Sequence, residues 1–181
     1  MFTAAIMITE NSFITIKRHD TPCGTLTLGE LDGRLCLCDW QAEKRREFIV
    51  RRLKERLQAG FRDGTSPIIE ETERQIDEYF AGKRSTFDIP IIHTGTEFQK
   101  LVWTELMNIP YGTTVSYGCL ARRIGMPTAV RAVANANRAN PISIIVPCHR
   151  VIGSHGALTG YGGGVNVKAA LLKLEAEIKK K

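Results

Sequence analysis

The pattern of the chain changes near residue 92, and this change constrains the fold more than any other feature. Before it, short alternating segments predict strands, and two longer segments carry apolar residues at the spacing of helices. The expected strands are 12–17, 25–28 and 35–38, with a hairpin turn at Asp32-Gly33, and the expected helices are 43–58 and one from Pro67, capped by Ser66, to near Gly82. We therefore expect residues 1–92 to form an α/β domain, a small sheet with helices.

After residue 92, the chain reads as short helices separated by turns rich in glycine and proline. The expected helices are 97–106, 117–124, 129–139 and 165–180, with Ser116 and Thr128 as N-caps of the second and third. An apolar run at residues 142–146 predicts a strand that would present the residues after it on a rigid platform. We expect residues 93–181 to form a second, mainly α-helical domain.

The helices expected at 117–124 and 129–139 are joined by the turn Gly125-Met126-Pro127, which is the order of a helix-turn-helix. The second helix is rich in alanine, so it would be a slim rod that can approach DNA closely. Arg131 and Arg138 are seven residues apart and share one face. Few of its side chains could read a base code, which favours minor-groove binding without sequence preference. The alternative is an alanine-rich core helix.

Charge is divided unevenly between the two halves. Residues 1–92 carry 14 Lys/Arg and 15 Asp/Glu, a net charge of −1, whereas residues 93–181 carry 11 and 4, a net charge of +7. From Leu106 to Leu174 the chain has no Asp or Glu at all. This distribution favours a polyanion as the partner of the second half, although a basic solvated face without a partner would look the same.

Within this basic segment lies the motif Pro147-Cys148-His149-Arg150. A thiolate is the strongest nucleophile among the side chains, and here a proton acceptor adjoins it. Glu175, the first carboxylate after Glu105, could orient His149 if the last helix folds back on the thiol. Taken singly, Cys148 could equally be a small buried hydrophobe and His149 a structural residue.

The other cysteines indicate packing and a reducing compartment. The chain has 5 cysteines, an odd number, so complete pairing in disulfides is impossible. Cys36 and Cys38 are two residues apart on an expected strand, so their side chains should share one face. A zinc site that also uses His19 and Cys23 is an alternative, but the spacing fits no usual zinc motif. Packing in the core is therefore the preferred interpretation of these cysteines. Residues 1–8 are interpreted as a first strand or a loose arm rather than a signal peptide. No apolar run approaches the length that spans a bilayer. We therefore expect an intracellular protein, in the cytoplasm or, in a eukaryote, in the nucleus.

Taken together, the second half resembles the O6-alkylguanine-DNA alkyltransferase family. The resemblance covers nearly all of residues 95–177, and its segments are Phe98-Gln99-Lys100-Leu101-Val102-Trp103, Ile109-Pro110-Tyr111-Gly112, Val115-Ser116-Tyr117, Val130-Arg131-Ala132-Val133, Asn140-Pro141, Pro147-Cys148-His149-Arg150-Val151, Gly160-Tyr161 and 168–175. The first half is similar more loosely, through Thr21-Pro22-Cys23-Gly24 and residues 76–82. The family implies an α/β first domain and a helical second domain that contains a winged helix-turn-helix.

The resemblance also implies the activity, which is repair of O6-alkylguanine, and more weakly of O4-alkylthymine, in duplex DNA by a protein that inactivates itself. By matching position, Cys148 accepts the alkyl group. His149 and Glu175 form a relay that favours its thiolate through a water molecule. Asn140 organises the hinge beside the site, and Tyr117 contacts a phosphate and can protonate the departing guanine.

The remaining roles concern DNA and the base pocket. Arg131 would fill the gap left by the extruded base. The other residues expected at the DNA are Tyr117, Gly118, Thr128, Ala129, Ala132 and Ser154. The loop 151–162 would wall the base pocket, with Val151, Asn137, Tyr161 and Gly162 as its lining.

No cofactor is expected, because a thiolate can attack a saturated carbon with guanine as the leaving group. No metal is expected, because the cysteine and histidine positions that hold a structural zinc in some animal members do not line up with those of this chain. The expected partner is duplex DNA with alkylated bases, bound by a monomer, with cooperative assembly left open. Two other functions remain as alternatives. One is a helix-turn-helix module that recognises alkylated bases without reacting, and the other is a cysteine hydrolase that acts through an acyl-enzyme.

Overall fold

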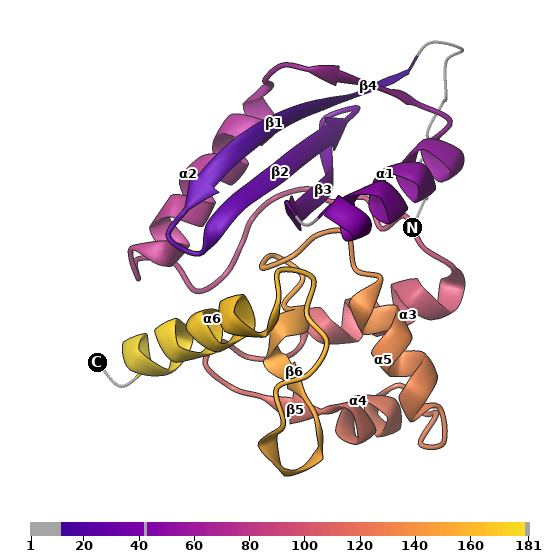
Figure 1. Cartoon of the computed structure of the whole chain (residues 1–181), viewed down its shortest axis with the longest axis vertical. Coiled ribbons are helices and arrows are strands. Elements are labelled where there is room, and N and C mark those ends of the chain that lie inside the picture. The colour runs from indigo at the N-terminus through magenta and orange to yellow at the C-terminus, as the bar shows by residue number, and fades with distance from the viewer. Residues whose placement is uncertain (1–11, 42, 180–181) are drawn as a thin grey trace.

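The computed structural model describes residues 12–41 and 43–179, and residues 1–8, where a first strand or arm was expected, lie outside them. The first domain is a four-stranded sheet with strand order β3-β2-β1-β4 and a helix on each face (Figure 1). Strands β1 and β2, and β2 and β3, pair antiparallel, and β1 pairs parallel with β4. The elements are β1 (Phe13–Thr21), β2 (Gly24–Leu31), β3 (Arg34–Trp40), α1 (Glu43–Leu57), β4 (Gly60–Asp63) and α2 (Pro67–Phe80).

Local signals in the sequence explain most of these boundaries. The β2–β3 hairpin turns at Asp32 and Gly33, whose φ angles of 51° and 73° are those of the expected two-residue turn. Helix α2 begins at Pro67 because the Ser66 hydroxyl accepts a hydrogen bond from the backbone N–H of Ile69. Both features were predicted from the sequence and are confirmed.

The prediction that Cys36 and Cys38 share one face of their strand is wrong. The pairing of β2 with β3 shifts register between Gly29 and Glu30, which leaves Cys36 as an extra residue in β3. Because of this bulge, Cys36 packs with the α1 side of the sheet and Cys38 with the other side. Both thiols are fully buried, and burial raises the pKa of Cys36 to about 12.

The second domain is mainly helical, as expected. Its elements are α3 (Glu97–Met107), β5 (Val115–Ser116), α4 (Tyr117–Arg123), α5 (Val130–Arg138), the short 3-10 helix η1 (Cys148–Arg150), β6 (Val151–Ile152), η2 (Ser154–Gly156) and α6 (Val165–Ile178). The Ser116 hydroxyl caps α4 by accepting from the N–H of Cys119 at 3.1 Å. Strands β5 and β6 pair parallel beside the α4–turn–α5 unit, an arrangement compatible with a winged helix-turn-helix, which stays a prediction.

Two local predictions in this domain are wrong. Thr128 does not cap α5, because the helix begins one residue later than expected, with Ala129 at the N-cap position and no side-chain hydrogen bond there. The run 142–146 is not a strand: it bends through turns, and Ile144 has a φ of 68°. A left-handed conformation is costly for a β-branched residue, so surrounding contacts must hold it.

The Asn140 side chain supplies those contacts. Its Nδ2 donates to the carbonyls of Ile142 at 3.2 Å and Val146 at 2.9 Å, and its Oδ1 accepts from the N–H of Ile142 at 3.0 Å. One buried amide therefore satisfies backbone groups that a strand would have paired with a neighbour. The result is a compact turn, rather than an extended platform, ahead of Cys148.

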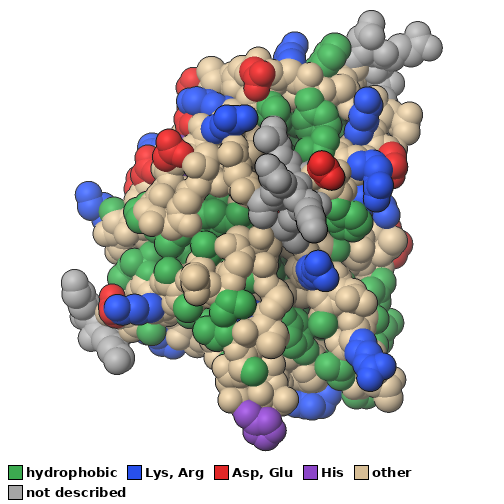
Figure 2. Space-filling view, viewed as in Figure 1, with side chains coloured by type: hydrophobic (Ala, Val, Ile, Leu, Met, Phe, Trp, Pro, Cys, Tyr) green, Lys and Arg blue, Asp and Glu red, His purple; other side chains and the backbone are tan. Residues whose placement is uncertain are grey.

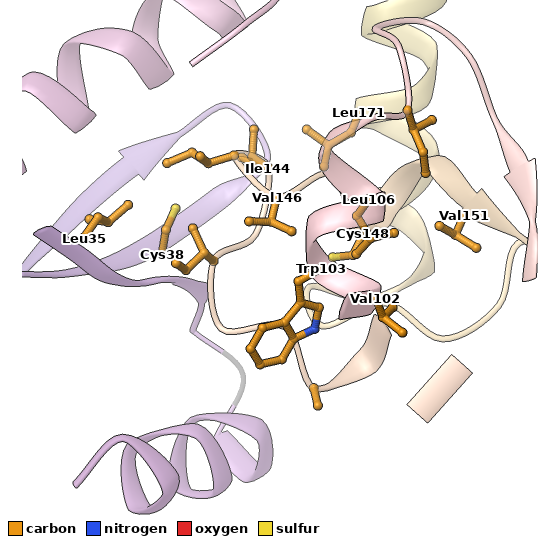
Figure 3. Close-up of a cluster of buried hydrophobic side chains, with 14 of the residues drawn as sticks. Leu35, Cys38, Val102, Trp103, Leu106, Ile144, Val146, Cys148, Val151 and Leu171 are labelled. Carbon is orange, nitrogen blue, oxygen red and sulfur yellow. The ribbon is translucent and has the colours of Figure 1, made fainter. Parts of the chain in front are cut away.

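The two domains share one hydrophobic core. Buried side chains of β2, β3 and α2 pack in the same cluster as those of α3, α5 and the 142–151 segment. Figure 3 shows Leu35 and Cys38 of β3 facing the part of this cluster that contains Val146 and Cys148. The backbone joins the domains as well, since the N–H of Cys38 donates to the carbonyl of Pro141 at 2.9 Å. Among the described residues, no helix is long and apolar enough to cross a membrane.

Candidate active site

Cys148 opens η1, between the Asn140 turn and β6. Its side chain is only 3% exposed and lies among Val102, Trp103, Leu106 and Val151 (Figure 3). The N–H of Cys148 donates to the carbonyl of Val146 at 2.7 Å, and the Asn137 amide donates to the carbonyl of Cys148 at 3.3 Å. The backbone on both sides of the thiol is thus held by hydrogen bonds within the protein.

The next residue, His149, is fully buried and pairs with the equally buried Glu175 of α6. Its Nε2 lies 2.8 Å from Glu175 Oε1. Since α6 does fold back onto η1, the predicted meeting of this imidazole with this carboxylate is confirmed as geometry. Adjacent residues on a strand would point apart, but Cys148 and His149 lie in the tight turn of η1 and not on a strand.

Glu175 accepts hydrogen bonds from three further groups. Arg150 donates through Nε at 3.0 Å to Oε2 and through Nη2 at 3.0 Å to Oε1. The N–H of Gly112 donates to Oε2 at 3.0 Å, and the Tyr79 hydroxyl, which comes from α2 of the first domain, donates to Oε1 at 2.9 Å. Every donor is directed at a carboxylate with no solvent exposure, so the group is held in one orientation.

These contacts determine the protonation of the pair. Burial alone would raise the pKa of Glu175, but hydrogen bonds from His149 and Arg150, the positive charge of Arg150, and that of His149 once acid protonates it, outweigh burial and lower the pKa to about 2. Burial lowers the pKa of His149, and the hydrogen bond that His149 donates to Glu175, together with the charge of that carboxylate, only partly opposes this. At neutral pH the carboxylate is therefore ionised and the imidazole neutral.

A neutral His149 next to an ionised Glu175 has a defined tautomer. Nε2 must carry the hydrogen, because only an N–H can bond to a carboxylate. Nδ1 is then a free acceptor, and it is buried with no protein hydrogen-bond partner among the described residues. The imidazole is therefore prepared to accept a proton at Nδ1, as a general base for a nearby thiol must be.

Lys168 is a buried cation close to the same site. Its side chain is fully buried, and Nζ donates to the carbonyls of Val151 at 2.6 Å and Thr159 at 2.9 Å. Burial lowers the pKa of Lys168, while the charge of a Cys148 thiolate would favour the protonated amine. Lys168 thereby ties the two ends of the 151–159 loop together and places positive charge near the thiol.

Three of the residues expected to line the base pocket, Asn137, Val151 and Tyr161, lie near Cys148. Val151 is buried, Asn137 is 1% exposed, and Tyr161 and Gly162 are half-buried. The Tyr161 ring lies 6.3 Å from the His149 ring, between centroids. Tyr117 is also half-buried; burial raises the pKa of its hydroxyl, and hydrogen bonds with Thr159 and Asn137 partly offset that rise. Its hydroxyl therefore keeps its proton at neutral pH and can donate it.

The residues expected at the DNA lie on one end of the second domain, at α4, α5 and η2 (Figure 1). Four are exposed, Arg131, Thr128, Ala132 and Ser154, and three are half-buried, Tyr117, Gly118 and Ala129. In Figure 2 most acidic side chains lie over the first domain, whereas the lower end shows Lys, Arg and His. The segment without carboxylates therefore forms the surface at this end. Within residues 12–41 and 43–179, no three His, Cys, Asp or Glu side chains gather as a metal site would require.

Sequence reasoning missed several residues that complete the site. Arg150 stood in the motif but received no role, and Lys168 was counted only as part of the basic segment. Tyr79 and Trp40 have no polar signature, since their spacing is that of core residues of α2 and β3. Only the folded contacts with Glu175 and Tyr161 distinguish them from ordinary core residues.

Comparison with known proteins agrees with this geometry. The DNA-binding domain of 6-O-methylguanine DNA methyltransferase matches residues 97–177, and the ribonuclease-like domain of the same family matches residues 14–92. A methylated-DNA–protein-cysteine methyltransferase from Methanosarcina acetivorans is 57% identical over 105 residues, which is 58% of this chain and 67% of that protein. One from Mycobacterium tuberculosis is 59% identical over 101 residues, 56% of this chain and 61% of that protein.

Solved structures extend the match over both domains. The crystal structure of the Mycobacterium tuberculosis O6-methylguanine methyltransferase has a TM-score of 0.76 and 42% identity, and covers 91% of this chain and 93% of its own. A Mycobacterium tuberculosis relative solved in complex with DNA has a TM-score of 0.74 and 41% identity over 93% of this chain and 94% of its own. The matches reach from the sheet of the first domain to the last helix, and the chain belongs to the 6-O-methylguanine DNA methyltransferase family.

Proposed function

We propose that this chain repairs DNA by transferring an alkyl group from O6 of guanine in duplex DNA, and more weakly from O4 of thymine, to the sulfur of Cys148. The observation that carries the proposal is the buried His149–Glu175 pair directly beside Cys148, with a free acceptor at His149 Nδ1. Family membership supports the same reaction, because the relatives are named for methyl transfer from DNA to a protein cysteine.

The chemistry needs no resident cofactor. The Cys148 thiol gives its proton to His149 Nδ1 through a water molecule, and Glu175 stabilises the imidazolium that forms. The thiolate attacks the alkyl carbon, so an S–C bond forms as the C–O6 bond breaks. Tyr117 provides the proton that the departing guanine takes up. A thioether remains on Cys148, and because nothing in the site can break it, each molecule acts once.

Access to the thiol requires the base to leave the helix. Cys148 is 3% exposed, so a base stacked in a duplex cannot reach it. Extrusion of the nucleotide costs a few kcal/mol, least at a damaged base pair. Arg131 projects from the exposed face of α5, where its side chain would fill the gap, and the neighbouring Ala132 lets the backbone approach the groove. We expect one monomer to bind one lesion.

The test is the intact mass of the protein after incubation with duplex DNA that carries one O6-methylguanine. The proposal predicts that each molecule gains one methyl group and then accepts no more. Cys148→Ala should gain none while still binding the same DNA. An unmodified wild-type protein that holds the lesion would instead indicate a binding module, and repeated turnover of an ester with recovery of the free thiol would indicate a hydrolase.

A further inference from the structure

Trp40, the last residue of β3, extends from the first domain to the loop that walls the base pocket. Its side chain is 4% exposed, and Nε1 donates a hydrogen bond to the Tyr161 hydroxyl at 3.0 Å. The two rings meet edge to face, with centroids 6.5 Å apart. This partly buried polar contact between residues 121 positions apart in the sequence joins the two domains at the loop expected to wall the pocket.

The same indole packs against the backbone of Gly163. A Cβ at that position would lie 2.7 Å from Trp40 Cγ, closer than real Cβ atoms approach. Gly163 is therefore required to let the loop pass directly over the indole ring. Trp40 thus contacts the loop at two points, the hydroxyl of Tyr161 and the backbone two residues later.

The loop has few other restraints. Gly160 and Gly164 have φ angles of 52° and 91°, and between η2 and α6 the chain forms no helix or strand. Lys168 holds the loop at Thr159, and the N–H of Gly164 donates to the carbonyl of Tyr161 at 3.1 Å. The position of the Tyr161 side chain therefore depends on its own contacts rather than on regular secondary structure, and the first domain supplies one of these contacts through Trp40.

Tyr161 lies close enough to the reacting sulfur for its position to matter. Burial raises the pKa of its hydroxyl well above 10, and the charge of Cys148 adds to the rise. The hydroxyl also bonds to Ser143, whose Oγ donates to Asp39 Oδ1 at 2.9 Å. Two consecutive residues of β3, Asp39 and Trp40, thus support the wall, one through Ser143 and one directly.

We propose that Trp40 is a positioning residue that fixes the Tyr161–Gly163 wall and thereby limits the size of the alkyl group that Cys148 can accept. The inference rests on the proposed function and gives the first domain a part in substrate selection. A wall held by the first domain excludes bulky groups, and a released wall admits them. Methyl transfer needs little of this space, so it should respond less than benzyl transfer.

The experiment compares rates of transfer from duplexes that carry O6-methylguanine or O6-benzylguanine. Trp40→Phe keeps a ring but removes the indole donor, and Tyr161→Phe removes the acceptor. Each should raise the benzyl-to-methyl rate ratio about fivefold, the factor that corresponds to about 1 kcal/mol for one lost hydrogen bond. The double variant should raise it no further than Tyr161→Phe alone, because Tyr161→Phe already breaks the contact that Trp40→Phe removes.

Arg52→Ala is the matched control. Arg52 of α1 joins the domains at another place, since it donates to Gln99 Oε1 of α3 at 2.7 Å and to the carbonyl of Ala139, which follows α5, at 3.5 Å. Its rate ratio should equal that of the wild type, and thermal unfolding identifies variants that have merely lost stability. A wild type that transfers neither group rejects the proposed function. A wild type that transfers both, with an unchanged ratio in folded Trp40→Phe and Tyr161→Phe, rejects only the role of Trp40.

Discussion

At the scale of single residues, the centre of the site is the carboxylate of Glu175. It has no exposed surface, and yet its pKa is lowered to about 2, because four groups donate to its two oxygens. A buried ion is expensive unless all its hydrogen-bonding capacity is used. The cost of burial is offset here by donors from both domains, since Tyr79 belongs to α2 and the others to the second domain.

We predict that Tyr79→Phe lowers the free energy of unfolding by about 2 kcal/mol, the usual value of a hydrogen bond to a charged group. Urea denaturation measures it. Tyr111→Phe is the control: the Tyr111 hydroxyl is buried without a hydrogen-bond partner in the described part of the chain, so its removal should change stability by less than about 0.5 kcal/mol. Equal losses in the two variants would contradict the contact.

Stability should also fall in acid for two separable reasons. The pKa of His149 is lowered from 6.5, so the folded state opposes its protonation, and stability is lost as the pH falls below about 6.5. The pKa of Glu175 is lowered from 4.5 to about 2, so its contribution is present above pH 4.5 and is lost between there and pH 2. Denaturation at a series of pH values should show both losses, and His149→Gln should lack the first. A pH dependence unchanged by that substitution would contradict the buried neutral imidazole.

At the scale of elements, the α4–turn–α5 unit and the turn before η1 have different roles. The first presents Arg131 at the surface, whereas the second, organised by Asn140, leads to the buried Cys148. Helix α5 runs directly into the Asn140 turn, so a short segment of chain connects the residue expected to enter the duplex with the proposed alkyl acceptor.

We predict that Arg131→Ala slows repair of O6-methylguanine in duplex DNA at least about tenfold, because the extruded state loses the side chain that fills the gap and extrusion costs a few kcal/mol. Reaction with free O6-benzylguanine, which needs no extrusion, should be unchanged. Arg34→Ala, an exposed arginine on β3 of the first domain, is the control and should affect both reactions little. If Arg131→Ala slowed both reactions equally, its role would be structural rather than at the duplex.

How far the sequence predicts these elements depends on where their stabilising contacts come from. Caps and turns act within a few residues, so Ser66, Ser116 and the Asp32-Gly33 turn were predictable. The run 142–146 was not, because a buried side chain replaces the strand partner that its composition suggests. The bulge at Cys36 was hidden for a similar reason, since register is decided by the paired strand.

In the site, too, some residues could be predicted from the sequence and others depend on contacts made only in the folded chain. Cys148, His149 and Glu175 could be named because a motif and a family resemblance place them, although 25 positions or more separate the carboxylate from the other two. Tyr79, Lys168 and Trp40 act through contacts that only the folded chain creates. In the sequence they have the spacing of core residues or belong to a basic segment.

At the scale of the whole molecule, the two domains differ in net charge, but their buried side chains pack together in a shared core. The division of the chain at residue 92 stays a prediction, and the family matches end at 92 and resume at 97. The larger buried cluster, in contrast, contains residues of both domains, and the first domain contributes Tyr79 to the contacts of Glu175 and Trp40 to those of Tyr161. The first domain therefore contacts the proposed active site directly.

The charge distribution predicts that affinity for undamaged duplex DNA falls steeply with salt. Each phosphate neutralised by Lys or Arg contributes a slope of about −0.9 in log K against log salt. Replacing Arg122 and Arg123, both exposed on α4, with Ala should reduce the slope if that face contacts phosphates. Replacing Lys54 and Arg56, at the end of α1 in the first domain, should leave it unchanged. A slope altered only by the α1 pair would move the DNA to the other domain.

The most direct test of the central claim is to locate the transferred group. After reaction with O6-methylguanine duplex, proteolysis and mass analysis distinguish the peptide that contains Cys148 from those that contain Cys23, Cys36, Cys38 and Cys119. The account predicts methylation of Cys148 alone, to one group per protein, and a much slower reaction in His149→Gln. A methyl group on any other cysteine, or a His149→Gln variant as fast as the wild type, would contradict it.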